Sequence, residues 1–358
     1  MSALLDRLVA AIPDESERFR AVCADVTDWH ALVESAARDG VLGLLRREVT
    51  RLEIRVPEEA RRAMERLHAS EALWQANAVR ALDAALDALE SARIRAAVLK
   101  GPALVERLYP EPSLRCSSDL DILVAEADTD GAVAALEPLG YAVETGPSAR
   151  YARRHLHHVQ LLGHRPPVIE LHFRAYEGFG VRMAAEKFLE RARPHRTAGG
   201  ARCLVLAPED ELLYLAVHAA GHCFDRLLWL HDLKLLIAAE PAMDWSAVEA
   251  RARAMGVMTA FALACEMLRR RLGVAMPPSA AAKAPGRLRR RLVAPFVDGR
   301  SAPPASRPLV TLRQLLTMAA LCDTPAAGVR FMRHHVARLA RRRVQRWLPA
   351  LTPAEWAA

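Results

Sequence analysis

Two acidic residues inside a short apolar run place the strongest constraint on the fold of this chain. Asp119 and Asp121 lie in the run 119–124, and the remaining four positions of that run are all apolar. Such a run predicts a β-strand. Because side chains alternate faces along a strand, the two carboxylates project from the same face and repel each other. A divalent cation relieves that repulsion, and Mg²⁺ prefers carboxylate oxygens together with substrate phosphates.

A third acid lies in a second apolar run. Glu170 occupies the middle of 168–173, and His172 shares its face by the same period of two. If the two strands pair, Asp119, Asp121 and Glu170 converge, and we expect them to hold Mg²⁺ or Mn²⁺ as a metal site. The competing interpretation is the water-facing side of an edge strand, which alternates in the same way.

Helical periodicity dominates both ends of the chain and a strand-rich section separates them. Hydrophobic residues make up 52% of the chain and aromatic residues only 5%, a composition that favours helices. We therefore predict an α+β fold, a small mixed-sheet core flanked by N-terminal and C-terminal helical regions. The predicted domains are 1–91, 92–206 and 207–358, the last with a basic tail. Strands are expected near 96–99, 119–124, 141–144, 155–162 and 168–173. Helices are expected over 58–91, 102–108, 129–139, 209–221, 225–239, 245–255, 257–272, 309–322 and 326–347, with a connector at 276–308.

Composition also narrows the function classes. The net charge of +8 comes almost entirely from Arg, which indicates a bias of the whole chain rather than a nucleic-acid surface. No run of about 18 uncharged apolar residues occurs, so no membrane span is expected, and the first residues lack a secretory signal. The six cysteines are scattered without a Cys-x-x-Cys pair, which predicts a cytoplasmic protein with no zinc site.

Three motifs in a fixed order resemble one known superfamily. They read Leu99-Lys100-Gly101 before a predicted helix, Arg115-x-x-x-Asp119-Leu120-Asp121 on the first acidic strand, and Ile169-Glu170-Leu171-His172 on the second. This order resembles the nucleotidyltransferases related to DNA polymerase beta. It looks most like an uncharacterised bacterial branch of that superfamily, over about residues 95–175.

The resemblance implies an activity and a set of roles. Such enzymes use Mg²⁺ and a nucleoside triphosphate, ATP among them, move the nucleoside monophosphate onto an acceptor and release pyrophosphate. The acceptor here could be a small molecule, a tRNA end or a protein side chain. The catalytic and metal-binding residues would be Asp119, Asp121 and Glu170. The nucleotide-binding residues would be Lys100, Gly101, Arg115, Ser118 and His172.

Several individual roles stay open. Lys100 and Gly101 either cradle phosphate at the start of the next helix or form an ordinary strand-to-helix turn. Arg115 pairs either with phosphate or with one of the aspartates. The superfamily has Gly-Gly or Gly-Ser where this chain has Lys100-Gly101-Pro102. A catalytically weak nucleotide-binding or regulatory scaffold is therefore the first alternative function.

Histidines and a basic tail complete the candidates. His155, His157 and His158 indicate an exposed strand face or the rim of a site rather than a metal site. His218 and His222 have the i, i+4 spacing of zinc proteases but lack the Glu that follows the first His, so they are expected between helices or at a cleft. The Arg-rich segment 330–346 is amphipathic. A helical adaptor that binds a partner through this tail is the second alternative function.

Overall fold

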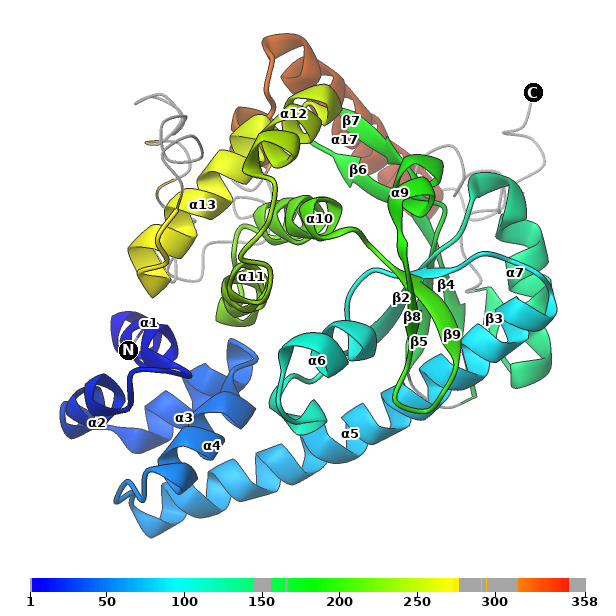
Figure 1. Ribbon diagram of the computed structural model, residues 1–358. Coiled ribbons are helices and arrows are strands. Elements are labelled where there is room, and N and C mark those ends of the chain that lie inside the picture. Colours follow the sequence, from blue (N-terminus) through cyan, green and yellow to red (C-terminus); the bar gives the residue numbers. More distant parts are fainter. Residues whose placement is uncertain are drawn as a thin grey trace.

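The computed structural model describes residues 2–143, 156–164, 167–276, 291, 294 and 315–347. It confirms the predicted fold class, because a mixed β-sheet forms the centre and helices flank it on both sides in the sequence (Figure 1). None of the helices in this described part has the length and apolar character needed to cross a bilayer.

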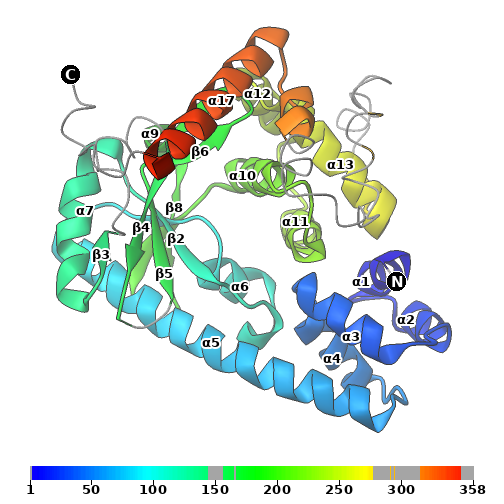
Figure 2. The same cartoon turned by 180° about the vertical axis from the view of Figure 1, so that it is seen from behind.

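The N-terminal region consists of four short helices followed by a very long one. The long helix α5 (Glu58–Ser91) has the bounds that the sequence predicted, with no internal Gly or Pro and two glutamates in its first turn, where they favour the helix dipole. It runs along one side of the molecule and links the short helices at one end to the sheet at the other (Figures 1 and 2). The short helices are α1 (Ser2–Ala11), α2 (Ser16–Ala24), α3 (Trp29–Arg38) and α4 (Leu42–Arg51).

Seven strands form the main sheet, in the order β3-β4-β5-β2-β1-β9-β8. The pairs β2–β5 and β1–β9 are parallel and the other four pairs are antiparallel. The sheet is therefore mixed, as the sequence predicted. The strands are β1 (Ala97–Val98), β2 (Asp119–Leu123), β3 (Ala142–Val143), β4 (His158–Leu162), β5 (Val168–His172), β8 (Arg193–Arg196) and β9 (Arg202–Val205).

The alternation of side chains along β2 decides which face of the sheet carries the acidic residues. Leu120 and Ile122 are fully buried in an apolar cluster shared with α5 and with α7 (Thr129–Leu136). Asp119 and Asp121 therefore project from the opposite face. Helix α5 contributes Ala78, Leu82, Ala85, Leu86 and Leu89 to that apolar cluster, and α7 contributes Ala132 and Leu136.

The C-terminal helices lie on the acidic side and share a core with the N-terminal ones. One buried apolar cluster joins Leu8 of α1 to Leu213 of α10 and Leu268 of α13. Lys234 of α11 also donates to the backbone carbonyl of Ala10 at 2.7 Å. The division into three domains stays a prediction. These elements are α6 (Pro102–Leu108), α10 (Pro208–Gly221), α11 (Leu227–Ala239), α12 (Trp245–Met255), α13 (Met258–Leu272) and α17 (Pro325–Trp347).

The section between β5 and α10 holds structure that the sequence did not predict. A two-stranded sheet, β6 (Arg174–Gly178) with β7 (Val181–Ala184), precedes α9 (Ala185–Arg191), β8 and β9. These strands are short and rich in Arg, so they lack the apolar run on which strand prediction depends. Of the predicted helix 309–322, residues 315–320 are helical and 309–314 lie outside the described residues. So does most of the connector 276–308.

Candidate active site

Strand pairing brings the predicted acids together on one face. In the parallel register of β2 and β5, Asp121 lies level with Glu170. On the other side of β5, antiparallel β4 places Gln160 opposite Glu170 and His158 opposite His172. The Gln160 amide donates to Glu170 Oε1 at 3.2 Å. The predicted pairing of the two acidic strands is therefore present, with Asp119, Asp121 and Glu170 on the same face of the sheet.

Asp121, Glu170 and His172 form a compact group. One ligand atom from each lies within 4.8 Å of the other two. His172 Nε2 is 3.1 Å from Asp121 Oδ1 and 3.6 Å from Glu170 Oε2. Asp119 is two residues along β2 and is reached through Lys100, whose ammonium lies 2.5 Å from Asp121 Oδ2 and 3.2 Å from Asp119 Oδ1. Lys100 therefore neutralises the pair of aspartates that the sequence assigned to a cation.

The opposite charges in this cluster stabilise each other's ionised forms. Burial opposes ionisation of Asp121, but Lys100 and His172 outweigh it and lower its pKa far below the usual value. Burial likewise opposes ionisation of Glu170, yet the neighbouring His172, 3.6 Å away, lowers the pKa of that carboxyl to about 2. The two carboxylates in turn overcome the burial of His172 and raise its pKa to about 8. Burial, with repulsion from Asp121, raises the pKa of Asp119.

Arg115 is not brought into this cluster. Its guanidinium is buried and forms a fork with Asp232 of α11, with contacts of 2.8–3.0 Å. Its Nη1 also donates to Ser117 Oγ at 3.1 Å. The partner is thus neither of the two aspartates on β2, and that sequence interpretation is wrong. The fork fixes the segment that leads into β2 against the C-terminal helices.

Gly101 and Ser118 are the first and last residues of the segment 101–118, which lies between β1 and β2. Gly101 has φ 75°, a left-handed conformation that L side chains rarely adopt, and it directly precedes α6. Ser118 is exposed and its hydroxyl donates to Asp119 Oδ1 at 3.2 Å. Gly therefore has a conformational reason to be at this turn, whatever ligand the turn meets.

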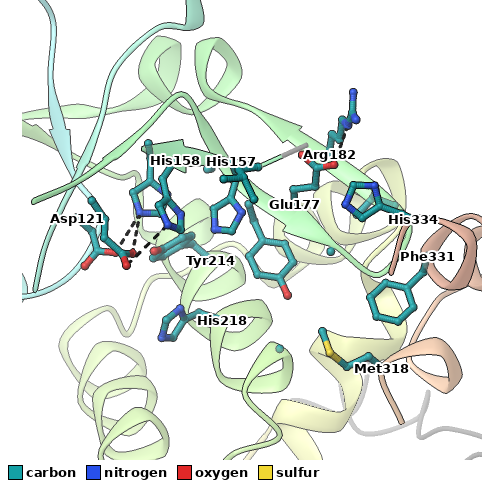
Figure 3. A pocket seen from close by; sticks show the side chains of 18 of the residues that line it. Asp121, His157, His158, Glu177, Arg182, Tyr214, His218, Met318, Phe331 and His334 are labelled. Carbon is teal, nitrogen blue, oxygen red and sulfur yellow. Dashed lines mark hydrogen bonds and ion pairs between the residues drawn. The ribbon is translucent and has the colours of Figure 1, made fainter. Parts of the chain in front are cut away.

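A cavity of about 1040 Å³ opens beside the cluster. Asp121, Glu170 and His172 line one part of it together with Tyr214 of α10. Figure 3 shows Asp121 and Tyr214 in this part of the cavity. Its walls come from the strands β2 to β7 and short stretches between them, and from α10, α17 and Met318. Among the described residues, seven histidines line it, namely His157, His158, His172, His218, His222, His334 and His335.

These histidines refine several sequence expectations. His218 and His222 line the cavity, as expected for a cleft, and their rings lie 4.7 Å apart. His157 and His158 also face it, although they are consecutive, because His157 precedes β4 and strand alternation does not apply there. His155 lies outside the described residues. Burial and the neighbouring His172 lower the pKa of His157 well below its usual value and that of His158 to about 4.

Sequence reasoning missed part of the lining. Gln160 and Tyr214 were not singled out, although His158 and Gln160 share a strand face by period two and this signal was present. The N-terminal half of α17 contributes Arg330, Phe331 and His334 to the cavity. The basic tail was predicted as an amphipathic helix, and its start is a wall of the cavity.

The donor set fits a hard divalent cation. Asp119, Asp121 and Glu170 supply carboxylate oxygens, which Mg²⁺ and Mn²⁺ prefer. The cluster also needs positive charge, since the three acids lie on one face and draw in the Lys100 ammonium. A cation at these acids with Lys100 moved to a phosphate would satisfy the same charge requirement.

Comparison with known proteins defines the family. A search of curated proteins found no match. Among solved structures, the solution structure of the antibiotic-resistance factor ANT(2'')-Ia is similar over 50% of this chain and 91% of that one, with 15% identity and a TM-score of 0.37. A family model described as "uncharacterised nucleotidyltransferase" matches residues 25–273, which includes α3 to α13 and all three acids. The chain, with its acidic strands inside that match, belongs to the uncharacterised nucleotidyltransferase family.

Proposed function

We propose that this protein transfers a nucleoside monophosphate from a nucleoside triphosphate to an acceptor, with Mg²⁺ or Mn²⁺ as its ion. The observation that carries the proposal is the convergence of Asp121 and Glu170, paired in register on β2 and β5, beside a cavity of about 1040 Å³. Family membership supports nucleotidyl transfer in general. The geometry supports the more specific ion and residue roles.

Three acids would hold the ion. Asp119, Asp121 and Glu170 present oxygens from one face of the sheet. When bound, such an ion neutralises the phosphate charge that develops as pyrophosphate leaves. His172 donates to Asp121 at 3.1 Å and so orients that carboxylate, while Gln160 donates to Glu170 at 3.2 Å and orients the other. Glu170 lines the cavity and its side chain is more exposed than that of Asp121, 19% against 1%, so it is our candidate for receiving the acceptor's proton.

Lys100 would change partner when the nucleotide binds. Burial disfavours its charged form, but Asp121 and Asp119 outweigh burial and raise its pKa, so the ammonium is charged. Once an ion takes over the aspartates, this point charge is within reach of the triphosphate. Gly101 and Ser118 flank the same position. Arg115 holds the segment in place through Asp232 and, in this proposal, does not contact phosphate.

The acceptor would enter by the cavity. Its lining is mixed, with tyrosines, histidines and the start of α17, and it is large enough for a small molecule or the end of a larger one. We place the reaction in the cytoplasm, where nucleoside triphosphates are abundant. The alternative, a nucleotide-binding scaffold with weak catalysis, is favoured by the Lys100 ammonium, which satisfies the aspartates without any ion.

Calorimetry with a nucleoside triphosphate tests the ion site. Asp119→Asn combined with Asp121→Asn removes the charges and keeps the shapes. We expect wild-type binding to strengthen with Mg²⁺ and the double variant to lose that dependence. Asp87→Asn, an exposed position on α5, is the matched control and should behave as wild type. Unchanged Mg²⁺ dependence in the double variant would place the ion elsewhere.

A further inference from the structure

Three histidines beside the acids form a second cluster with its own chemistry. His157, His158 and His172 each offer a ring nitrogen, and these atoms lie within 4.8 Å of one another. The ring centroids of the three pairs are 4.5, 5.0 and 5.4 Å apart. Figure 3 shows His158 and His157 following Asp121 along the cavity wall. Three imidazoles thus gather at one point on the lining of the cavity.

The nitrogens of this cluster include atoms that lack partners. His172 is buried, and its Nδ1 has no hydrogen-bond partner among the described residues; the same holds for Nδ1 of His158. An unpartnered buried nitrogen costs about 1–3 kcal/mol, so a ligand for these atoms is favoured. The observation is independent of the ring spacing and concerns two of the same three rings.

A carboxylate already orients His172 as metal sites require. Its Nε2 lies 3.1 Å from Asp121 Oδ1 and donates to it. Because the two carboxylates raise the pKa of His172 to about 8, Nδ1 also carries a proton, and a metal ion would bind at Nδ1 by displacing that proton. Metal-bound histidines almost always donate their other N–H to a carboxylate, carbonyl or water. Asp121 would therefore act on this ion through His172, while its other oxygen faces Lys100.

The backbone holds the other two rings close to it. His158 is the direct partner of His172 in the β4–β5 register. The carbonyl of His157 accepts hydrogen bonds from Phe173 N at 3.0 Å and Arg174 N at 3.2 Å. Bonds of about 2.0–2.1 Å in a tetrahedral zinc site place ligand nitrogens roughly 3.4 Å apart. The three ring nitrogens lie within 4.8 Å of one another, so binding would require the rings to rotate towards a common centre.

We propose that His157, His158 and His172 bind a Zn²⁺-type transition-metal ion, distinct from the hard cation at the aspartates. Imidazole nitrogens select Zn²⁺ over Mg²⁺, and the oxygen-rich acids select the reverse. Three protein ligands leave one position for water or an oxygen of a substrate. The ion would then fix an acceptor group beside Glu170. Binding of the ion itself does not depend on the proposed transferase function.

Titration of the chelator-treated, full-length protein with Co²⁺ and Zn²⁺ tests the site. We expect one Co²⁺ per chain, with the visible bands of a tetrahedral ion and no thiolate charge-transfer band, and displacement of Co²⁺ by Zn²⁺. His157→Gln and His158→Gln should each weaken binding by more than about 100-fold, because loss of a ligand exceeds the 10–100-fold cost of losing its hydrogen-bond partner. Circular dichroism checks that each variant folds.

Controls separate this site from the alternatives. His30→Gln, on an exposed surface of α3, and His222→Gln, elsewhere in the cavity, should bind as wild type. Asp121→Asn should weaken Zn²⁺ by only about 10–100-fold. No Co²⁺ binding by the wild type, wild-type affinity in both His157→Gln and His158→Gln, or a larger loss in Asp121→Asn than in His157→Gln would each overturn the proposal.

Discussion

The buried fork between Arg115 and Asp232 should be the most damaging ion pair to break. Asp232→Asn keeps the side-chain volume and removes the charge. Both residues are almost fully buried, and Tyr109 also donates to Asp232 at 2.6 Å. The change leaves the Arg115 guanidinium buried without a counter-charge. Breaking such a pair costs about 3–5 kcal/mol.

That cost is large compared with the stability of a folded protein. Typical values are about 5–15 kcal/mol, so the variant should lose a large share of its free energy of unfolding. Urea denaturation followed by circular dichroism measures it. Glu90→Gln, which breaks the exposed pair with Arg202, is the matched control and should cost less than about 1 kcal/mol.

A double variant separates the charge from the packing. Arg115→Met combined with Asp232→Leu removes both charges, so it should be more stable than Asp232→Asn alone. A cost below about 1 kcal/mol for Asp232→Asn, equal to that of Glu90→Gln, would refute our reading of this fork as the link between β2 and the C-terminal helices.

Three further predictions concern single sites. Lys100→Ala should weaken binding of a triphosphate more than that of its nucleoside, measured by calorimetry; equal losses would indicate a folding role. Gly180→Ala should lower the free energy of unfolding in urea by more than about 1 kcal/mol, and by more than Gly273→Ala does. Both glycines have φ near +70°, but of the two only Gly180 would place a Cβ 2.2 Å from a backbone oxygen of α17. Burial lowers the pKa of His231 to about 3, so the unfolded chain binds a proton there below about pH 6.5 and the folded protein does not. Stability should fall as pH drops from 6.5 towards 3, and His231→Gln should reduce that slope by about 1.4 kcal/mol per pH unit; an unchanged slope would contradict the buried neutral ring.

The sequence predicted those parts of the fold that depend on local periodicity. The long helix α5 and the short α6 have the predicted bounds, and α12 does as well. The common face of Asp119 and Asp121 follows from the period of a strand, and the pairing of β2 with β5 puts Glu170 on it. Each of these needs only neighbouring residues or one strand pair.

Long-range contacts explain what was not predicted. Strand β9 joins the sheet beside β1, and its residues pair with residues 107 positions earlier in the sequence, as Leu204 does with Ala97. Nothing in the composition of β9 indicates that partner. Arg115 finds Asp232, 117 positions away, because folding brings α11 against the start of β2. Lys100 pairs with the aspartates for the same reason, since charge balance is decided by three-dimensional proximity.

Transfer of label from a nucleoside triphosphate tests the central claim most directly. With Mg²⁺ and an extract of acceptors, the wild type should transfer label from the α-phosphate and not from the γ-phosphate. Asp121→Asn should lose about 1000-fold in rate, since ion stabilisation of several kcal/mol is removed at 1.36 kcal/mol per tenfold, while Asp87→Asn keeps the wild-type rate. Transfer of the γ-label instead, no transfer by the wild type, or equal rates in Asp121→Asn and wild type would contradict nucleotidyl transfer at this site.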